Sequence, residues 1–294
     1  MCHLIYTDTF YMKRKWIRWV SWILLTPIIL FVILMVLLYV PPVQNLLRRE
    51  VTAYASKATG MQIQVERIDL RFPLNLLVRG VEVIQQPDTL LSLESLNVRV
   101  QAWPLIKGKV EVDEVTLSRV AVNSADLMEG MKIKGVLGRF FLQSHGVDLS
   151  NELAVINQVE LSDTHMQLLM NDTTTTPKDT TASAPINWKV ALHQLKLKNV
   201  SFSMQLPADS MRMTAHIGEA AINDAQADLK NQYYDLKKFL LLGTSASYDT
   251  GTAQPTEGFD ASHIAVRDIR IALDSLLYKG RDMNAVIREF TMNE

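Results

Sequence analysis

The chain has 294 residues, with 30 basic and 31 acidic side chains, a net charge of −1 and a mean hydropathy of +0.07. This balance argues against an electrostatic nucleic-acid binder, which needs clustered excess Lys and Arg, and the 48% hydrophobic content argues against a largely disordered chain. The single cysteine, Cys2, excludes an internal disulfide framework and a cysteine-rich metal site.

The first predicted element is an apolar run over residues 16–40, where 21 of 25 residues are hydrophobic. Its uncharged part, residues 19–40, would reach roughly 33 Å as a helix, enough for a hydrocarbon core of about 30 Å. The run is longer than the core of a cleavable signal, and no small-residue cleavage site follows it. We therefore predict an uncleaved single-pass signal anchor.

The flanks of this run predict its orientation. Basic residues crowd its N-terminal side, whereas none follows it before Arg48, so residues 1–15 are expected in the cytoplasm and the bulk of the chain in the bacterial periplasm. We expect three tryptophans to anchor at the cytoplasmic interface, the alternative being packing inside the membrane. The predicted membrane-interface residues are Lys13, Arg14, Lys15, Trp16, Arg18, Trp19 and Trp22.

Residues 41–60 follow as a short amphipathic juxtamembrane helix, with Gly60 as its stop. Its apolar positions recur with helical spacing, and we expect that face to cap the first strands of a sheet; lying on lipid is the alternative. The apolar positions are Val43, Leu46, Leu47, Val51, Tyr54, Ala55 and Ala58.

From residue 61 onward the hydrophobic period changes to two, and Pro- and Gly-containing turns separate the segments, which predicts antiparallel β-structure over residues 61–294. One pattern recurs seven times: an apolar residue, two polar residues, then apolar, polar, apolar. The copies span residues 65–70, 93–98, 112–117, 156–161, 192–197, 266–271 and 287–292.

The doubled polar step within each copy would reverse the side-chain alternation unless the strand bulges or bends there. A bulge in strand after strand would coil an elongated, twisted sheet around an apolar groove; the alternative is that each step marks a hairpin or a strand end. Two polar segments, residues 171–185 and 243–258, are predicted to be flexible loops. Asp172-Thr173-Thr174 and Asp179-Thr180-Thr181 resemble a bacterial O-glycosylation sequon, but we expect an ordinary solvated loop there.

Catalytic and metal-binding patterns are missing from the sequence. It has no P-loop, no G-x-G-x-x-G and no G-x-S-x-G, and its six histidines show no i, i+4 pair. We therefore expect a protein that is not an enzyme and that uses no cofactor and no metal.

The order of elements from Lys13 to about Val122 resembles the opening of AsmA-like and TamB-like envelope proteins. The resemblance rests on the anchor, the helix ending in Thr59-Gly60, and the segments 63–68, 76–83, 90–98 and 105–117. It implies an inner-membrane-anchored β-groove that moves phospholipid towards the outer membrane. TamB-like proteins also engage an outer-membrane insertase-class partner through a C-terminal region that is missing here, so we expect a fragment or a truncated reading frame.

The leading hypothesis is that lipid acyl chains lie along the apolar side of the repeats. The alternative is a scaffold for outer-membrane protein assembly or secretion, which binds client β-strands at an exposed edge. The predicted lipid-binding residues are Ile63, Val65, Ile68, Leu70, Leu96, Val98, Val115, Leu117, Val159, Leu161, Leu195, Leu197, Ile269 and Ile271.

Overall fold

The fold is described from a computed structural model, which defines residues 26, 29, 36, 39–72, 74–106, 111–124, 130–148, 151–170, 187–251, 254 and 257–293. Within these ranges, no helix is both long enough and apolar enough to cross a membrane. Almost all of the predicted anchor, including its seven interface residues and the cytoplasmic segment, lies outside the described residues. The predicted loop over residues 171–185 lies outside them as well.

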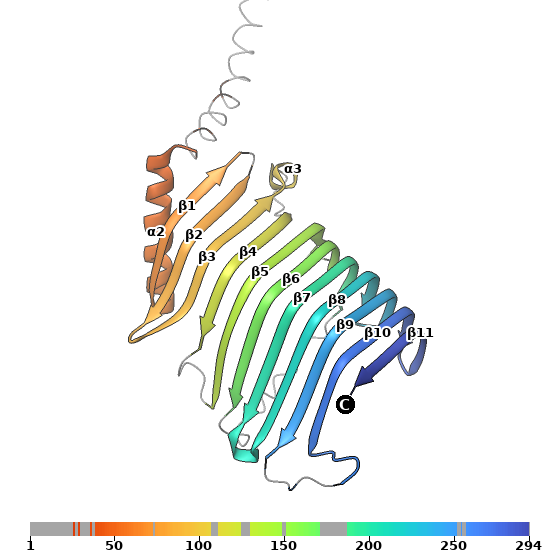
Figure 1. Cartoon of the computed structure of the whole chain (residues 1–294). Helices are drawn as coiled ribbons and strands as arrows, with labels where there is room; N and C mark the ends of the chain where they lie inside the picture. The colour runs from red at the N-terminus through yellow and green to blue at the C-terminus, as the bar shows by residue number, and fades with distance from the viewer. Residues whose placement is uncertain are drawn as a thin grey trace, which may run out of the picture.

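The described residues form one eleven-stranded sheet in which each strand pairs with the next along the chain, from β1 to β11 (Figure 1). Two helices and a 3₁₀ turn accompany it. The elements are α2 Pro41–Thr59, β1 Gln62–Arg71, β2 Asn75–Gln85, β3 Asp88–Val100, α3 Ala102–Ile106, β4 Val112–Asn123, β5 Met131–Asp148, β6 Leu153–Met170, β7 Lys189–Leu206, η1 Pro207–Asp209, β8 Met211–Asp228, β9 Tyr233–Thr250, β10 His263–Lys279 and β11 Asp282–Asn293.

The prediction of a mainly β-protein is confirmed, but the sheet is not antiparallel throughout. β6 and β7 run parallel, in a register that pairs Leu161 with Leu197, whereas the other neighbours are antiparallel. Short turns give antiparallel hairpins, while a parallel pair needs a longer connection. That connection falls between Met170 and Lys189, where the sequence alone suggested only a loop.

One edge of the sheet is covered by α2, which lies along β1 (Figure 1). Side chains of the helix bond to the strand's main chain: Ser56 Oγ accepts the Ile63 N–H at 3.1 Å, and Arg48 donates to the carbonyls of Val65 at 3.2 Å and Glu66 at 2.9 Å. An edge strand otherwise offers unpaired N–H and C=O groups to other chains. The helix therefore protects this edge.

The prediction of a loop over residues 243–258 is wrong for its first half. Gly243–Thr250 is the end of β9, where Ser247 pairs with Thr214 on β8 and with Ala265 on β10. The segment is polar, but a strand needs only backbone partners, and Thr214 and Ser247 add a 2.6 Å hydroxyl–hydroxyl bond. Polar composition therefore does not distinguish this strand end from a loop.

Candidate functional site

Two continuous rows of apolar side chains cross the whole sheet. A row here is a set of residues that are paired from strand to strand. Row I contains Ile68, Val78, Leu96, Leu117, Phe140, Leu161, Leu197, Ala220, Leu241, Ile271 and Phe290. Row II contains Leu70, Leu76, Val98, Val115, Leu142, Val159, Leu195, Ile222, Phe239, Leu273 and Ile287.

Rows I and II lie on the same face of the sheet, because they are two residues apart on most strands and side chains alternate between faces. The row between them, which faces the other way, is mixed: it includes Asp69, Thr116, Glu160 and Lys196. One face is therefore uniformly apolar over these two rows, while the opposite face carries charge.

Most of the predicted lipid-binding residues meet in these rows. Eleven of the fourteen belong to row I or row II. The other three lie outside the rows: Ile63 and Val65 are separated from row I by an interruption in the strand pairing, and Ile269 lies at that interruption, two residues before Ile271 of row I. The register thus brings together residues separated by more than 200 positions in the sequence.

The apolar rows are incompletely covered. Ile68 and Ala220 are buried and the β11 members Ile287 and Phe290 are exposed, whereas the other eighteen members are half-buried. In the described part of the chain only eight apolar residues are buried, and three of these are alanines. Half-buried Leu, Val and Ile in two rows leave an apolar surface much larger than scattered surface residues would give.

A first break line interrupts the strand pairing beside row I. At this line neighbouring strands skip one residue together, so that Val65 still pairs with Val81 and Arg67 with Arg79. The first break line contains Glu66, Gly80, Glu94, Arg119, Gly138, Asp163, Asn199, Gly218, Gly243 and Asp268. Over β1–β8 both partners contribute an extra residue at this line, and the register is kept.

Left-handed backbone and small residues make the first break line possible. Six of its members have a positive φ, between 46° at Arg119 and 58° at Gly80. Asn and Asp adopt this conformation more readily than most residues, and Asn199 donates to Asp163 Oδ1 at 2.7 Å across the parallel pair. Glycine serves where strands approach closely: a Cβ added at Gly138 would lie 2.7 Å from Asp163 Cβ.

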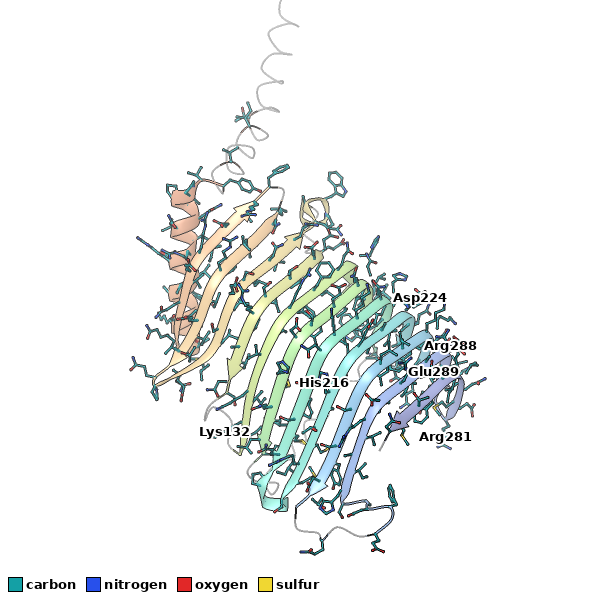
Figure 2. All side chains as sticks on the ribbon, viewed as in Figure 1. Lys132, His216, Asp224, Arg281, Arg288 and Glu289 are labelled. Carbon is teal, nitrogen blue, oxygen red and sulfur yellow. The ribbon has the colours of Figure 1, made fainter. Side chains whose placement is uncertain are left out.

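A second break line crosses the sheet beyond row II. Its members are polar or charged and several bond to one another: Asn157 Nδ2 lies 2.7 Å from His145 Nδ1, and His193 Nδ1 lies 3.1 Å from Asp224 Oδ1. Figure 2 labels Asp224 and Arg288 in this part of the sheet, with Lys132 towards the opposite strand ends. The second break line contains Asp113, His145, Asn157, His193, Asp224, Lys237, Asp274 and Arg288.

The seven copies of the repeat divide between the two break lines. The copies that begin at Val65, Leu93 and Val266 place their doubled polar step on the first line, and the other four place it on the second. Other members of the first break line, such as Arg119 and Asn199, lie outside the seven predicted copies. The sequence does mark them, because Leu117-Ser-Arg-Val120 and Leu197-Lys-Asn-Val200 also have a polar pair between two apolar residues.

The expectation that the apolar face of α2 caps the sheet is wrong. The helix contacts β1 through Gln44, Arg48 and Ser56, while Val51 and Tyr54 are 45% and 77% exposed. Polar side chains of α2 contact β1 because the edge of a strand presents main-chain donors and acceptors. The apolar side of α2 remains open.

The charged groups of the sheet form local pairs. The Asn231 amide bonds to the Asp228 carboxylate and lowers its pKa, and the Asp235 carboxylate raises the pKa of Lys237. Both pairs stabilise the ends of β8 and β9 by exposed contacts. Among the described residues, no group of three His, Cys, Asp or Glu side chains could hold a metal ion.

Comparison of the sequence with protein-family models gives no match, and comparison with curated proteins gives none either.

Proposed function

We propose that the protein is an inner-membrane-anchored periplasmic protein of the AsmA/TamB type, which holds lipid acyl chains against rows I and II for phospholipid transport and outer-membrane biogenesis. The observation that carries the proposal is the pair of uninterrupted, half-buried apolar rows across eleven strands. The resemblance of residues 13–122 to the opening of those proteins supports it independently.

The physical basis of binding is burial of apolar surface. Each methylene group transferred from water to an apolar surface contributes about 0.8 kcal/mol. Ten strand spacings of about 4.8 Å give the rows a length of about 48 Å, longer than an extended acyl chain. Rows I and II have no polar member, so a chain could shift along them without breaking hydrogen bonds.

In this proposal the sheet bends at the two break lines. An extra residue in both strands returns the side-chain alternation to the same face, so the apolar rows on either side of a line would share one face. Val65, Leu93 and Val120 on the far side of the first line would then extend the surface of row I. Repeated across the sheet, the bend would curl it into a groove.

Charged substitutions in row II test lipid binding. Val115→Asp with Leu195→Asp in the full-length chain should strongly reduce the phospholipid that co-purifies in mild detergent, as measured by mass spectrometry. Thr116→Asp with Lys196→Asp is the matched control, because each control residue is adjacent in the sequence and faces the opposite side. Unchanged lipid in a folded row II variant, or equal loss in the control, contradicts the proposal.

A second candidate function is a scaffold that binds β-strands of client proteins. It is favoured by β11, whose twelve residues are all exposed and which pairs only with β10 in the described part of the chain. Strand addition at such an edge uses main-chain hydrogen bonds. Val286→Pro should remove strand addition, since proline cannot donate to a ladder, and should leave bound lipid unchanged. If β11 still crosslinks to an outer-membrane β-protein in the Val286→Pro variant, this candidate is contradicted.

A further inference from the structure

Two aromatic side chains project from one end of the sheet. Phe72, in the turn after β1, is 85% exposed, and Trp103, in α3, is 68% exposed. Burial normally removes such rings from water, and their burial contributes about 1.5–3 kcal/mol for a side chain of this size. We refer to Phe72 and Trp103 as the aromatic rim.

The aromatic rim lies at the end of the sheet where α2 begins. Gln44, in the first turn of α2, donates to the Leu70 carbonyl at 3.0 Å, two residues before Phe72. The Val100 N–H donates to the Leu74 carbonyl at 3.0 Å, which holds the end of β3 beside the β1–β2 turn. Figure 1 shows α3 and the first turn of α2 at this same end.

We propose that the aromatic rim inserts into the outer leaflet interface of the membrane that residues 19–40 cross, an inference that rests on the proposed anchor. The helix α2 starts at Pro41, directly after that uncharged run, so Gln44 lies only about 5 Å along the helix from its end. A rim this close to the end of the anchor is held at the depth where Trp and other aromatic rings concentrate.

The charge beside the rim matches an anionic bilayer surface. Arg71, at the end of β1 and next to Phe72, is exposed and forms no ion pair within the described residues. Each basic side chain near an anionic membrane contributes about 1 kcal/mol. Anionic phospholipid at the rim is therefore favoured over a neutral lipid surface.

Contact at the rim gives lipid an entry point to the apolar face. Leu70, the first member of row II, is two residues from Phe72, and Val98 lies near the end of β3 that leads to Trp103. An acyl chain that leaves the leaflet beside the rim meets row II first. The rim therefore places the loading end of the sheet at the membrane.

Site-specific quenching tests the rim in the full-length chain. In a Cys2→Ser background, a thiol-reactive fluorophore is attached at Phe72→Cys, Trp103→Cys or, as control, Phe259→Cys, and the protein is reconstituted in phosphatidylethanolamine–phosphatidylglycerol vesicles with brominated acyl chains. Phe259 is a matched control because it is 82% exposed and follows β9 at the opposite strand end. Quenching at the two rim positions should exceed quenching at Phe259 severalfold.

A second label separates a rim contact from an effect of the dye. A fluorophore at Ala102→Cys, an exposed α3 position, should be quenched with the native rim and should lose most of that quenching with Phe72→Asp and Trp103→Asp. Equal quenching at rim and control positions overturns the inference, as does an unchanged Ala102 signal in the Asp variant. If the rim proposal alone is wrong, phospholipid still co-purifies with row II intact. If the proposed membrane anchor is wrong, the protein does not co-sediment with the vesicles.

Discussion

Adding one methyl group at Gly138 should disrupt the first break line. In Gly138→Ala the new Cβ would lie 2.7 Å from Asp163 Cβ, 3.0 Å from the Asp163 carbonyl oxygen and 3.1 Å from the Ser162 carbonyl oxygen. Such a contact forces two strands apart and costs about 1–3 kcal/mol, against a gain of about 0.4–1 kcal/mol from the loss of glycine flexibility in the unfolded chain.

Thermal unfolding followed by circular dichroism measures this loss. Each kcal/mol shifts the Tm of a domain of this size by about 2–4 °C, so we expect Gly138→Ala to melt several degrees below the parent protein. Gly135→Ala is the control on the same strand, because its Cβ would meet only the His165 carbonyl oxygen at 3.3 Å and Met166 Cα at 3.8 Å. It should melt close to the parent protein.

A double substitution identifies the clash as the cause. Asp163→Gly removes the Cβ nearest to the new methyl group and suits the φ of 51° at that position. Gly138→Ala should therefore cost less in the Asp163→Gly background than alone, an interaction that a double-mutant cycle measures. Equal stability of Gly138→Ala and Gly135→Ala, or no coupling to Asp163, would refute the close approach of strands at the first break line.

Three further predictions concern the backbone and α2. Asn199→Val should destabilise the sheet by about 1–3 kcal/mol in chemical denaturation, because a β-branched residue is strained at a φ of 52°, whereas Asn199→Gly should cost much less; similar losses would contradict this conformation. Arg48→Met should speed amide hydrogen exchange along β1, since the Val65 and Glu66 carbonyls lose their donor; unchanged exchange would show that the helix does not protect that edge. Val51→Gln with Tyr54→Gln should leave the Tm unchanged, because both side chains are exposed, and a fall of many degrees would show that this face of α2 packs in the fold.

Alternation in the sequence was sufficient to predict a mainly β-protein and half of the members of the apolar rows. Residues such as Leu117 and Leu161 share a row because each follows a doubled polar step by a fixed number of residues, and that spacing is visible in the sequence. What the spacing could not supply was the pairing across strands. Three copies of the repeat, including Val65–Leu70, lie on the first break line and four on the second, and only the register separates them.

Other features depend on contacts that hydrophobicity does not encode. The apolar face of α2 was expected to pack, but the edge of β1 offers main-chain groups, and Arg48 and Ser56 meet them better than Val51 could. The parallel pairing of β6 with β7 follows from how the chain returns between Met170 and Lys189, which leaves no mark on the alternation within either strand. Gly138 also gave no signal, because its role depends on Asp163 opposite it.

The central proposal, lipid on the apolar face, is tested most directly by photo-crosslinking in living cells. A photoreactive residue placed at Leu117 or Leu161 in row I should form adducts with phospholipid, detected by mass spectrometry of the purified full-length protein, while the same residue at Thr116 or Glu160, one position away on the opposite face, should form few. Equal lipid adducts on both faces, or none at Leu117 and Leu161, would contradict the account.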